Sequence, residues 1–85
     1  MRWEVKWTEQ ALKDASRLDQ QIRERVLNAL DRLADGSSVD VKKLVGEGDE
    51  LRLRVGDWCV RFQFHHSSGV IEVLRVLHRS RVYRE

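Results

Sequence analysis

The chain has 85 residues, of which 41% are hydrophobic and 35% charged, and its formal net charge is +2. This length excludes a second domain, so residues 1–85 are expected to form one small domain, and the composition excludes a disordered chain. No apolar run approaches the roughly 20 residues that span a bilayer, and the opening MRWEVKW lacks the apolar stretch of a signal peptide, so we expect a cytoplasmic protein with no membrane partner.

Basic residues are unevenly distributed along the chain. Residues 1–50 carry 9 lysines and arginines against 11 acidic residues, whereas residues 51–85 carry 7 arginines and no lysine, against Asp57, Glu72 and Glu85. Arginine presents a planar fork that matches phosphate with two hydrogen bonds, so the second part favours phosphate contact. On charge alone, an ordinary solvated surface remains the better explanation.

The first expected elements are a strand and a helix. Residues 2–7 alternate between apolar and charged side chains, which predicts a strand with one buried face. Thr8 is a plausible N-cap for a helix that ends at Leu18-Asp19. The apolar side of this helix would consist of Ala11, Leu12, Ala15 and Leu18.

A second helix is expected directly after the first. Asp19 is its predicted cap, and Asp35-Gly36-Ser37-Ser38 ends it. Its apolar stripe is Ile22, Val26, Ala29, Leu30 and Leu33. The first 38 residues therefore predict a strand followed by a helical hairpin.

The remaining chain predicts a polar connection and three strands. Residues 39–50 are interpreted as the connection, with Val41, Leu44 and Val45 expected to be buried. The strands are 51–55, 58–64 and 70–77, separated by the turn signals Gly56-Asp57 and Ser67-Ser68-Gly69. The sequence thus predicts an α+β fold in the order β-α-α-β-β-β, a four-stranded, mainly antiparallel sheet with the helical hairpin packed on one face.

Arginines alternate with apolar residues in two of these strands. If the apolar sides meet the helices, Arg52, Arg54 and Arg61 emerge on the opposite face, which we expect to stay open to solvent. The tail after the last strand adds His78, Arg79, Arg81, Tyr83 and Arg84. Together these residues predict a basic patch.

Such a patch suits the cleavage of RNA by its own 2′-hydroxyl. That reaction needs a base for the hydroxyl proton, cations for the charge on the phosphorane and an acid for the leaving 5′-oxygen. Arginines, a histidine and a phenol offer these groups. The expected chemistry requires no metal and no cofactor.

The residues also resemble a known family. The order of elements, the Lys43-Leu44-x-Gly46 stretch, the strand pair L-R-L-R-V-G-D-W and the closing R-V-L-H-R-S-R-V-Y-R are similar to the RelE/ParE superfamily of toxins from type II toxin-antitoxin modules. The resemblance covers essentially the whole chain. It implies that a cognate antitoxin binds and neutralises the protein.

The superfamily has two branches with different targets. RelE-like toxins enter the ribosomal A site and cleave messenger RNA, which would make this chain an endoribonuclease. ParE-like toxins share the fold but inhibit DNA gyrase. The basic sheet residues and the terminal tyrosine favour the RelE-like branch, with a gyrase inhibitor or a non-catalytic RNA-binding module as the alternatives.

The resemblance also assigns positions. Arg52 and Arg54 match basic strand positions, Arg79 matches the arginine after the last strand, and Tyr83 matches the terminal tyrosine. In the family an arginine usually follows the aromatic that opens the next strand, but here Cys59 follows Trp58. Arg61, on the same face about 6 to 7 Å away, is expected to supply the charge instead.

We therefore predict that Arg54, Arg61 and Arg79 hold the scissile phosphate and that Tyr83 or His78 moves a proton. The expected substrate-binding residues are Lys43, Arg52 and Arg81. Each aromatic candidate has a structural alternative, since Tyr83 can cover the edge of the core and His78 can cap the strand end. Cys59 is interpreted as a small strand residue, and the three tryptophans as core residues.

Overall fold

The computed structural model describes residues 2–37, 41–43 and 49–81, without the side chains of Lys42 and Lys43. The elements follow in the order β1 (Glu4–Trp7), α1 (Glu9–Ser16), α2 (Gln20–Ala34), β2 (Val41–Lys43), β3 (Leu51–Val55), β4 (Trp58–His65) and β5 (Val70–His78). This order confirms the predicted α+β fold. It also adds a short strand, β2, within the segment that was interpreted as a polar connection.

The strands form one mixed sheet in the order β1-β5-β4-β3-β2. β1 runs parallel to β5, and the other three pairs are antiparallel, as the predicted mainly antiparallel sheet requires. β5 lies between β1 and β4, which explains why VIEVLRVL is apolar at nearly every position. The β4 to β5 register shifts between Arg61 and Phe62, where a bulge interrupts the pairing.

Both helices begin at the predicted caps. The Thr8 side chain accepts a hydrogen bond from the Ala11 amide at 3.1 Å, and Asp19 accepts one from the Ile22 amide at 3.0 Å. These bonds satisfy amides that have no partner within the first helical turn. α2 ends at Ala34, and after the C-cap Asp35 the φ of +80° at Gly36 lets the chain turn away from the helix in the left-handed region that glycine favours.

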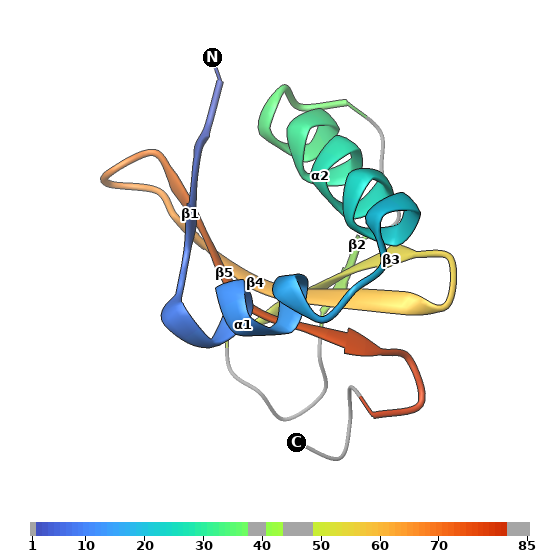
Figure 1. Cartoon of the computed structure of the whole chain (residues 1–85). Coiled ribbons are helices and arrows are strands. Elements are labelled where there is room, and N and C mark those ends of the chain that lie inside the picture. The colour runs from blue at the N-terminus through green and yellow to red at the C-terminus, as the bar shows by residue number, and fades with distance from the viewer. Residues whose placement is uncertain (1, 38–40, 44–48, 82–85) are drawn as a thin grey trace.

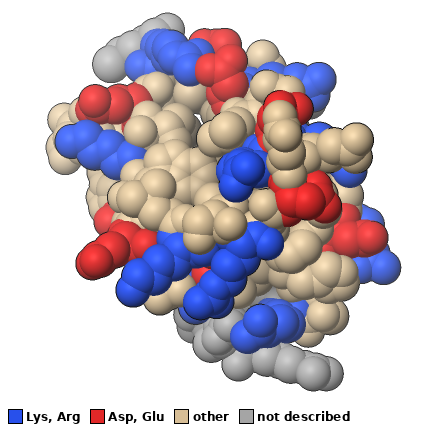
Figure 2. Space-filling model, in the orientation of Figure 1, with Lys and Arg blue, Asp and Glu red and all other residues tan. Residues whose placement is uncertain are grey.

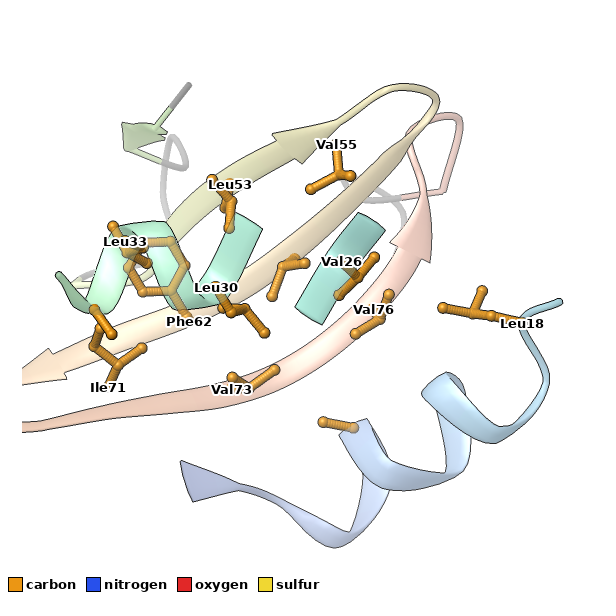
Figure 3. Packing of buried hydrophobic residues seen from close by; sticks show 13 residues of the cluster. Leu18, Val26, Leu30, Leu33, Leu53, Val55, Phe62, Ile71, Val73 and Val76 are labelled. Carbon is orange, nitrogen blue, oxygen red and sulfur yellow. The ribbon is translucent and has the colours of Figure 1, made fainter. Parts of the chain in front are cut away.

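One apolar cluster joins the helices to the sheet. α2 lies across one face of the sheet, and α1 lies along β5 (Figure 1). Side chains of α2 point into the sheet, and Leu18 closes the cluster from the α1 side (Figure 3). The least exposed large side chains are Phe62, Leu30, Leu53, Ile71, Val26, Val60 and Val73. Trp3, Trp7 and Trp58 pack against this cluster, as predicted.

α1 covers the edge of β5 beyond the end of β1. The Thr8 amide donates to the Val73 carbonyl at 3.0 Å, and the Thr8 hydroxyl donates to the Leu74 carbonyl at 3.1 Å. Further along, the Val76 amide donates to the Asp14 carboxylate at 2.9 Å. The helix thus supplies the partners that a neighbouring strand would provide, which protects the edge. It also fixes the C-terminal end of α1 beside the end of β5.

Candidate functional site

The three predicted arginines of the strands, Arg52, Arg54 and Arg61, lie in two rows across the sheet. Arg52 on β3 pairs in register with Arg61 on β4, which pairs with Arg75 on β5. The next row toward the β3 to β4 turn consists of Arg54, Cys59 and Leu77. Because residues directly opposite each other share a face, both rows belong to the side of the sheet away from α2.

We expected the side of the sheet away from α2 to be open to solvent, but it is partly buried. Arg61 is only 9% exposed, and its Nε donates to Glu50 Oε2 at 2.9 Å. Cys59 and Leu77 are also buried, and Arg52 is half-buried. The prediction of an exposed Arg61 is therefore wrong, because a buried guanidinium requires a carboxylate partner and Glu50 provides it.

Arg54 and Arg79 come together at the turn between β3 and β4. Both are exposed, and both contact the Gly56-Asp57 dipeptide. Arg54 Nε donates to the Gly56 carbonyl at 3.2 Å, and Arg79 Nε lies 3.7 Å from Asp57 Oδ1. The Arg79 amide also donates to the Asp57 carbonyl at 2.8 Å, which ties the chain after β5 to the turn.

A third arginine reaches the same turn from α2. Gly56 has a φ of +61°, and a Cβ atom added to it would lie 3.0 Å from Nη2 of Arg25. The exposed guanidinium of Arg25 therefore rests over the turn, although no feature of the sequence placed it there. Three guanidiniums from α2, β3 and the segment after β5 surround one dipeptide whose only acidic side chain is that of Asp57.

His78 lies at the end of β5 next to this turn. Its ring contacts the Trp58 ring edge to face, with centroids 5.4 Å apart. The Ser80 amide donates to His78 Nδ1 at 3.3 Å, so the neutral ring carries its proton on Nε2. Ser80 Oγ, 3.0 Å from the same Nδ1, can accept a hydrogen bond if the ring is protonated. Ser80 therefore contacts His78 Nδ1 through both its amide and its hydroxyl, which orients the ring at the end of β5.

An ion pair buried beside β5 fixes Arg75. Its Nε donates to Asp14 Oδ2 at 2.8 Å, and Asp14 itself is 6% exposed. Burial raises the pKa of the Asp14 carboxyl, but hydrogen bonds from Arg75, the Val76 amide and Gln10 outweigh it, so the net pKa is lowered. Arg75 and Asp14 were absent from the predicted site, because an arginine inside an apolar strand and an aspartate inside a helix gave no sign that they would meet.

The side chains of two predicted site residues lie outside the part of the chain that the structure describes. Tyr83 is beyond the described residues, and of Lys43 only the backbone, in β2, is described. Arg81 is exposed, and its amide donates to the His78 carbonyl at 2.8 Å. The structure therefore brings Arg54, Arg79 and His78 to one end of the sheet, whereas Arg52 and Arg61 lie one row away.

Two further observations concern residues 2–37, 41–43 and 49–81. Within them, no helix is long and apolar enough to cross a membrane. In the same part of the chain, no group of three or more His, Cys, Asp and Glu side chains is placed to hold a metal ion.

Comparison with known proteins gives one family and several related structures. Residues 5–83 match the family described as the ParE toxin of type II toxin-antitoxin systems, parDE. No curated protein matches the chain in sequence.

Among solved structures, the archaeal RelE-RelB complex from Pyrococcus horikoshii OT3 contains a chain that is 31% identical, with a TM-score of 0.77 over 96% of this chain and 100% of that one. A mutant of the Escherichia coli toxin RelE in the free state is 26% identical, with a TM-score of 0.76 over 100% of this chain and 94% of that one. A toxin-antitoxin complex from Mycobacterium tuberculosis, at 23% identity and a TM-score of 0.82, covers 93% of this chain and 100% of that one and shares the fold.

Proposed function

This chain belongs to the ParE toxin family within the RelE/ParE superfamily and is a toxin of a type II toxin-antitoxin module, and on that premise we propose that it stops translation by cutting messenger RNA on the ribosome. The observation that carries the proposal is the convergence of Arg54, Arg79 and His78 at one end of the sheet. Two exposed guanidiniums can hold a phosphate there. His78 lies in the adjacent row of the sheet, opposite Trp58, and is proposed to reach the phosphate around the end of the sheet.

The reaction is proposed to follow the 2′-hydroxyl route. A base takes the proton of the 2′-hydroxyl, O2′ attacks phosphorus, and the P–O5′ bond of the phosphorane breaks. Arg54 and Arg79 stabilise the added negative charge of the phosphorane. Protonated His78 gives a proton to the leaving O5′, and Tyr83 is the proposed base. The products are a 2′,3′-cyclic phosphate and a 5′-hydroxyl, and this route calls for neither metal nor cofactor.

The roles of the other predicted residues change with their surroundings. Arg61 is proposed to act indirectly, because Glu50 already neutralises its buried guanidinium and a phosphate would have to compete with that carboxylate. Arg52, Arg81 and Lys43 remain proposed contacts for the RNA backbone. Arg25 joins Arg54 and Arg79 as a further cation near the phosphate.

A cognate antitoxin is the proposed protein partner. Related structures are complexes of a toxin with an antitoxin, including the archaeal RelE-RelB complex. The exposed arginines at the β3 to β4 turn would attract nucleic acid indiscriminately if left uncovered. We expect an acidic or amphipathic segment of the antitoxin to cover them and to block the reaction.

The test is primer extension on a reporter message in growing cells. Expression of the unmodified protein at a level that stops growth should produce new 5′ ends within the translated part of the message. Co-expression of the protein encoded by the neighbouring reading frame should restore growth and remove these ends. An intact message in growth-arrested cells would contradict the proposed cleavage.

Inhibition of DNA gyrase is the second candidate. The match to the ParE toxin family favours it, and so does the buried Cys59 at the position where a nuclease of the superfamily usually has an arginine. Growth arrest with uncut message, an induced DNA-damage response and accumulated gyrase-DNA complexes would identify this function.

A further inference from the structure

A hollow of about 170 Å³ lies between the C-terminal end of α1 and the end of β5. We name it the α1-β5 hollow; the lining residues that matter here are Arg17, Trp58, Arg75, His78 and Arg81. It adjoins the proposed reaction centre, because Trp58 follows Asp57 directly and His78 precedes Arg79. In the orientation of Figure 1, lysine and arginine side chains gather over α1 in the lower part of the molecule (Figure 2).

The three basic residues of this hollow come from three different segments, and each segment is fixed by hydrogen bonds. Arg17 is the C-cap of α1, with its amide bonded to the Ala15 and Asp14 carbonyls. Arg75 is held on β5 by Asp14, and Arg81 is placed by the bond from its amide to the His78 carbonyl. Among the described lining residues the acidic one is Asp14, and its carboxylate is already occupied by Arg75 and by the Val76 amide. Because the Arg75-Asp14 pair is neutral as a whole, Arg17 and Arg81 give the described lining its net positive charge.

The chemistry of this lining selects its ligand. Guanidinium groups match phosphate oxygens with paired hydrogen bonds, and the Trp58 indole gives an aromatic surface on which a base or ribose can pack. The volume is well below the roughly 300 Å³ at which pockets for drug-sized molecules begin. A site of this size takes one nucleotide unit of a longer chain.

We propose that the α1-β5 hollow binds the nucleotide next to the scissile phosphate, with Arg17 as a substrate-positioning residue contributed by α1. This inference rests on the proposed function for the identity of the ligand, which is single-stranded RNA. The RNA backbone would pass from Arg54 and Arg79 at the turn, along His78, into the hollow. Arg17 would contact the phosphate of the neighbouring nucleotide, which does not react. By holding that nucleotide it would position the scissile phosphate.

The test measures binding without chemistry. The probe is a fluorescent hexanucleotide of RNA with 2′-O-methyl groups throughout, which lacks the attacking hydroxyl, and anisotropy is recorded at several salt concentrations. Removal of one phosphate contact to a single strand lowers the slope of log affinity against log salt by about 0.7. We expect this loss for Arg17→Ala. The control is Arg32→Ala, which removes the same charge from an exposed site on α2 at the far end of the sheet, and it should leave the slope unchanged.

A second measurement follows Trp58 directly. Its indole N–H resonance, assigned with a Trp58→Phe variant, should shift on addition of the uncleavable RNA and shift less in Arg17→Ala. An unchanged salt slope in Arg17→Ala, or an unmoved Trp58 resonance at saturation, would overturn the inference even if message is cut in cells. Conversely, the expected slope change together with intact message would leave the hollow as an RNA-binding site and overturn only the proposed cleavage.

Discussion

At the scale of single residues, the partner of each arginine decides what it can do. Arg61 forms an ion pair with Glu50, and Arg75 forms one with Asp14, so both charges are neutralised within the fold. Arg79 contacts Asp57 across 3.7 Å with both side chains about half or more exposed, and a pair of this kind contributes little to stability. A phosphate can therefore recruit the Arg79 guanidinium at little cost.

Replacement of Arg79 by alanine should separate rate from affinity. A contact that strengthens only in the transition state lowers the rate selectively, so we expect the single-turnover cleavage rate to fall by about 100-fold or more. Affinity for the uncleavable RNA should fall by less than about tenfold. Arg32→Ala, with its guanidinium far from the turn, is the matched control and should keep both values. Equal losses of rate and affinity in Arg79→Ala would mean that Arg79 only binds.

Asp14 predicts a pH dependence of stability. Its pKa is lower in the folded state, so it stabilises the fold above its ordinary value near 4, and that stabilisation is lost as the pH falls through the lowered value. In urea unfolding at neutral pH, Asp14→Asn should reduce the free energy of unfolding by about 2 kcal/mol, because charge-assisted hydrogen bonds to Arg75 are lost.

The difference between Asp14→Asn and the unmodified protein should begin to shrink below about pH 4, where the carboxyl of the unfolded chain takes up a proton, and should continue to shrink until the pH has fallen through the lowered pKa of the folded state. Glu24→Gln, an exposed change on α2 whose side chain contacts Gln20, should cost less than about 0.5 kcal/mol at any pH. A stability difference for Asp14→Asn that stays constant down to pH 2 would show that the carboxylate charge is not what stabilises this contact.

At the scale of elements, the strands and helices follow from the sequence because their signals are local. Alternation in β3 and β4, and the caps Thr8 and Asp19, each depend on residues close together in the chain. The short strand β2 could not be foreseen, since its three residues become a strand by pairing with β3, a tertiary contact. Register and edge protection are tertiary effects, and so α1 was expected on the sheet face and not along the edge of β5.

The contribution of Gly56 to the stability of the turn between β3 and β4 can be tested by substitution. Gly56→Ala would place a Cβ at a φ of +61° and push the Arg25 guanidinium away, whereas Gly36→Ala meets nothing within 4 Å at a φ of +80°. Since the end of an arginine side chain moves easily, we expect both variants to lose about 1 to 2 kcal/mol of stability from the backbone alone. Thermal or urea unfolding gives the comparison. A loss for Gly56→Ala more than about 2 kcal/mol greater than for Gly36→Ala would mean that Arg25 is a structural anchor of the turn.

At the scale of the whole molecule, the site depends on contacts between distant parts of the chain. The sequence identified Arg54 through the alternation of its strand and through the family resemblance, and it identified Arg79 and His78 in the basic tail after the last strand. It did not identify Arg17, Arg25 or Arg75, which reach the same region from α1, α2 and the middle of β5. Nor could it show that the face opposite α2 is partly buried, because burial depends on what covers a strand and not on its alternation.

The proposed cleavage of messenger RNA by 2′-hydroxyl attack is tested most directly by the chemical ends of its products. Purified protein is added to ribosomes programmed with a short end-labelled message, and the fragments are analysed by mass spectrometry. We predict an upstream fragment ending in a 2′,3′-cyclic phosphate and a downstream fragment with a 5′-hydroxyl, both strongly reduced with Arg79→Ala. A message left intact under conditions in which the same preparation blocks supercoiling by DNA gyrase would contradict the claim.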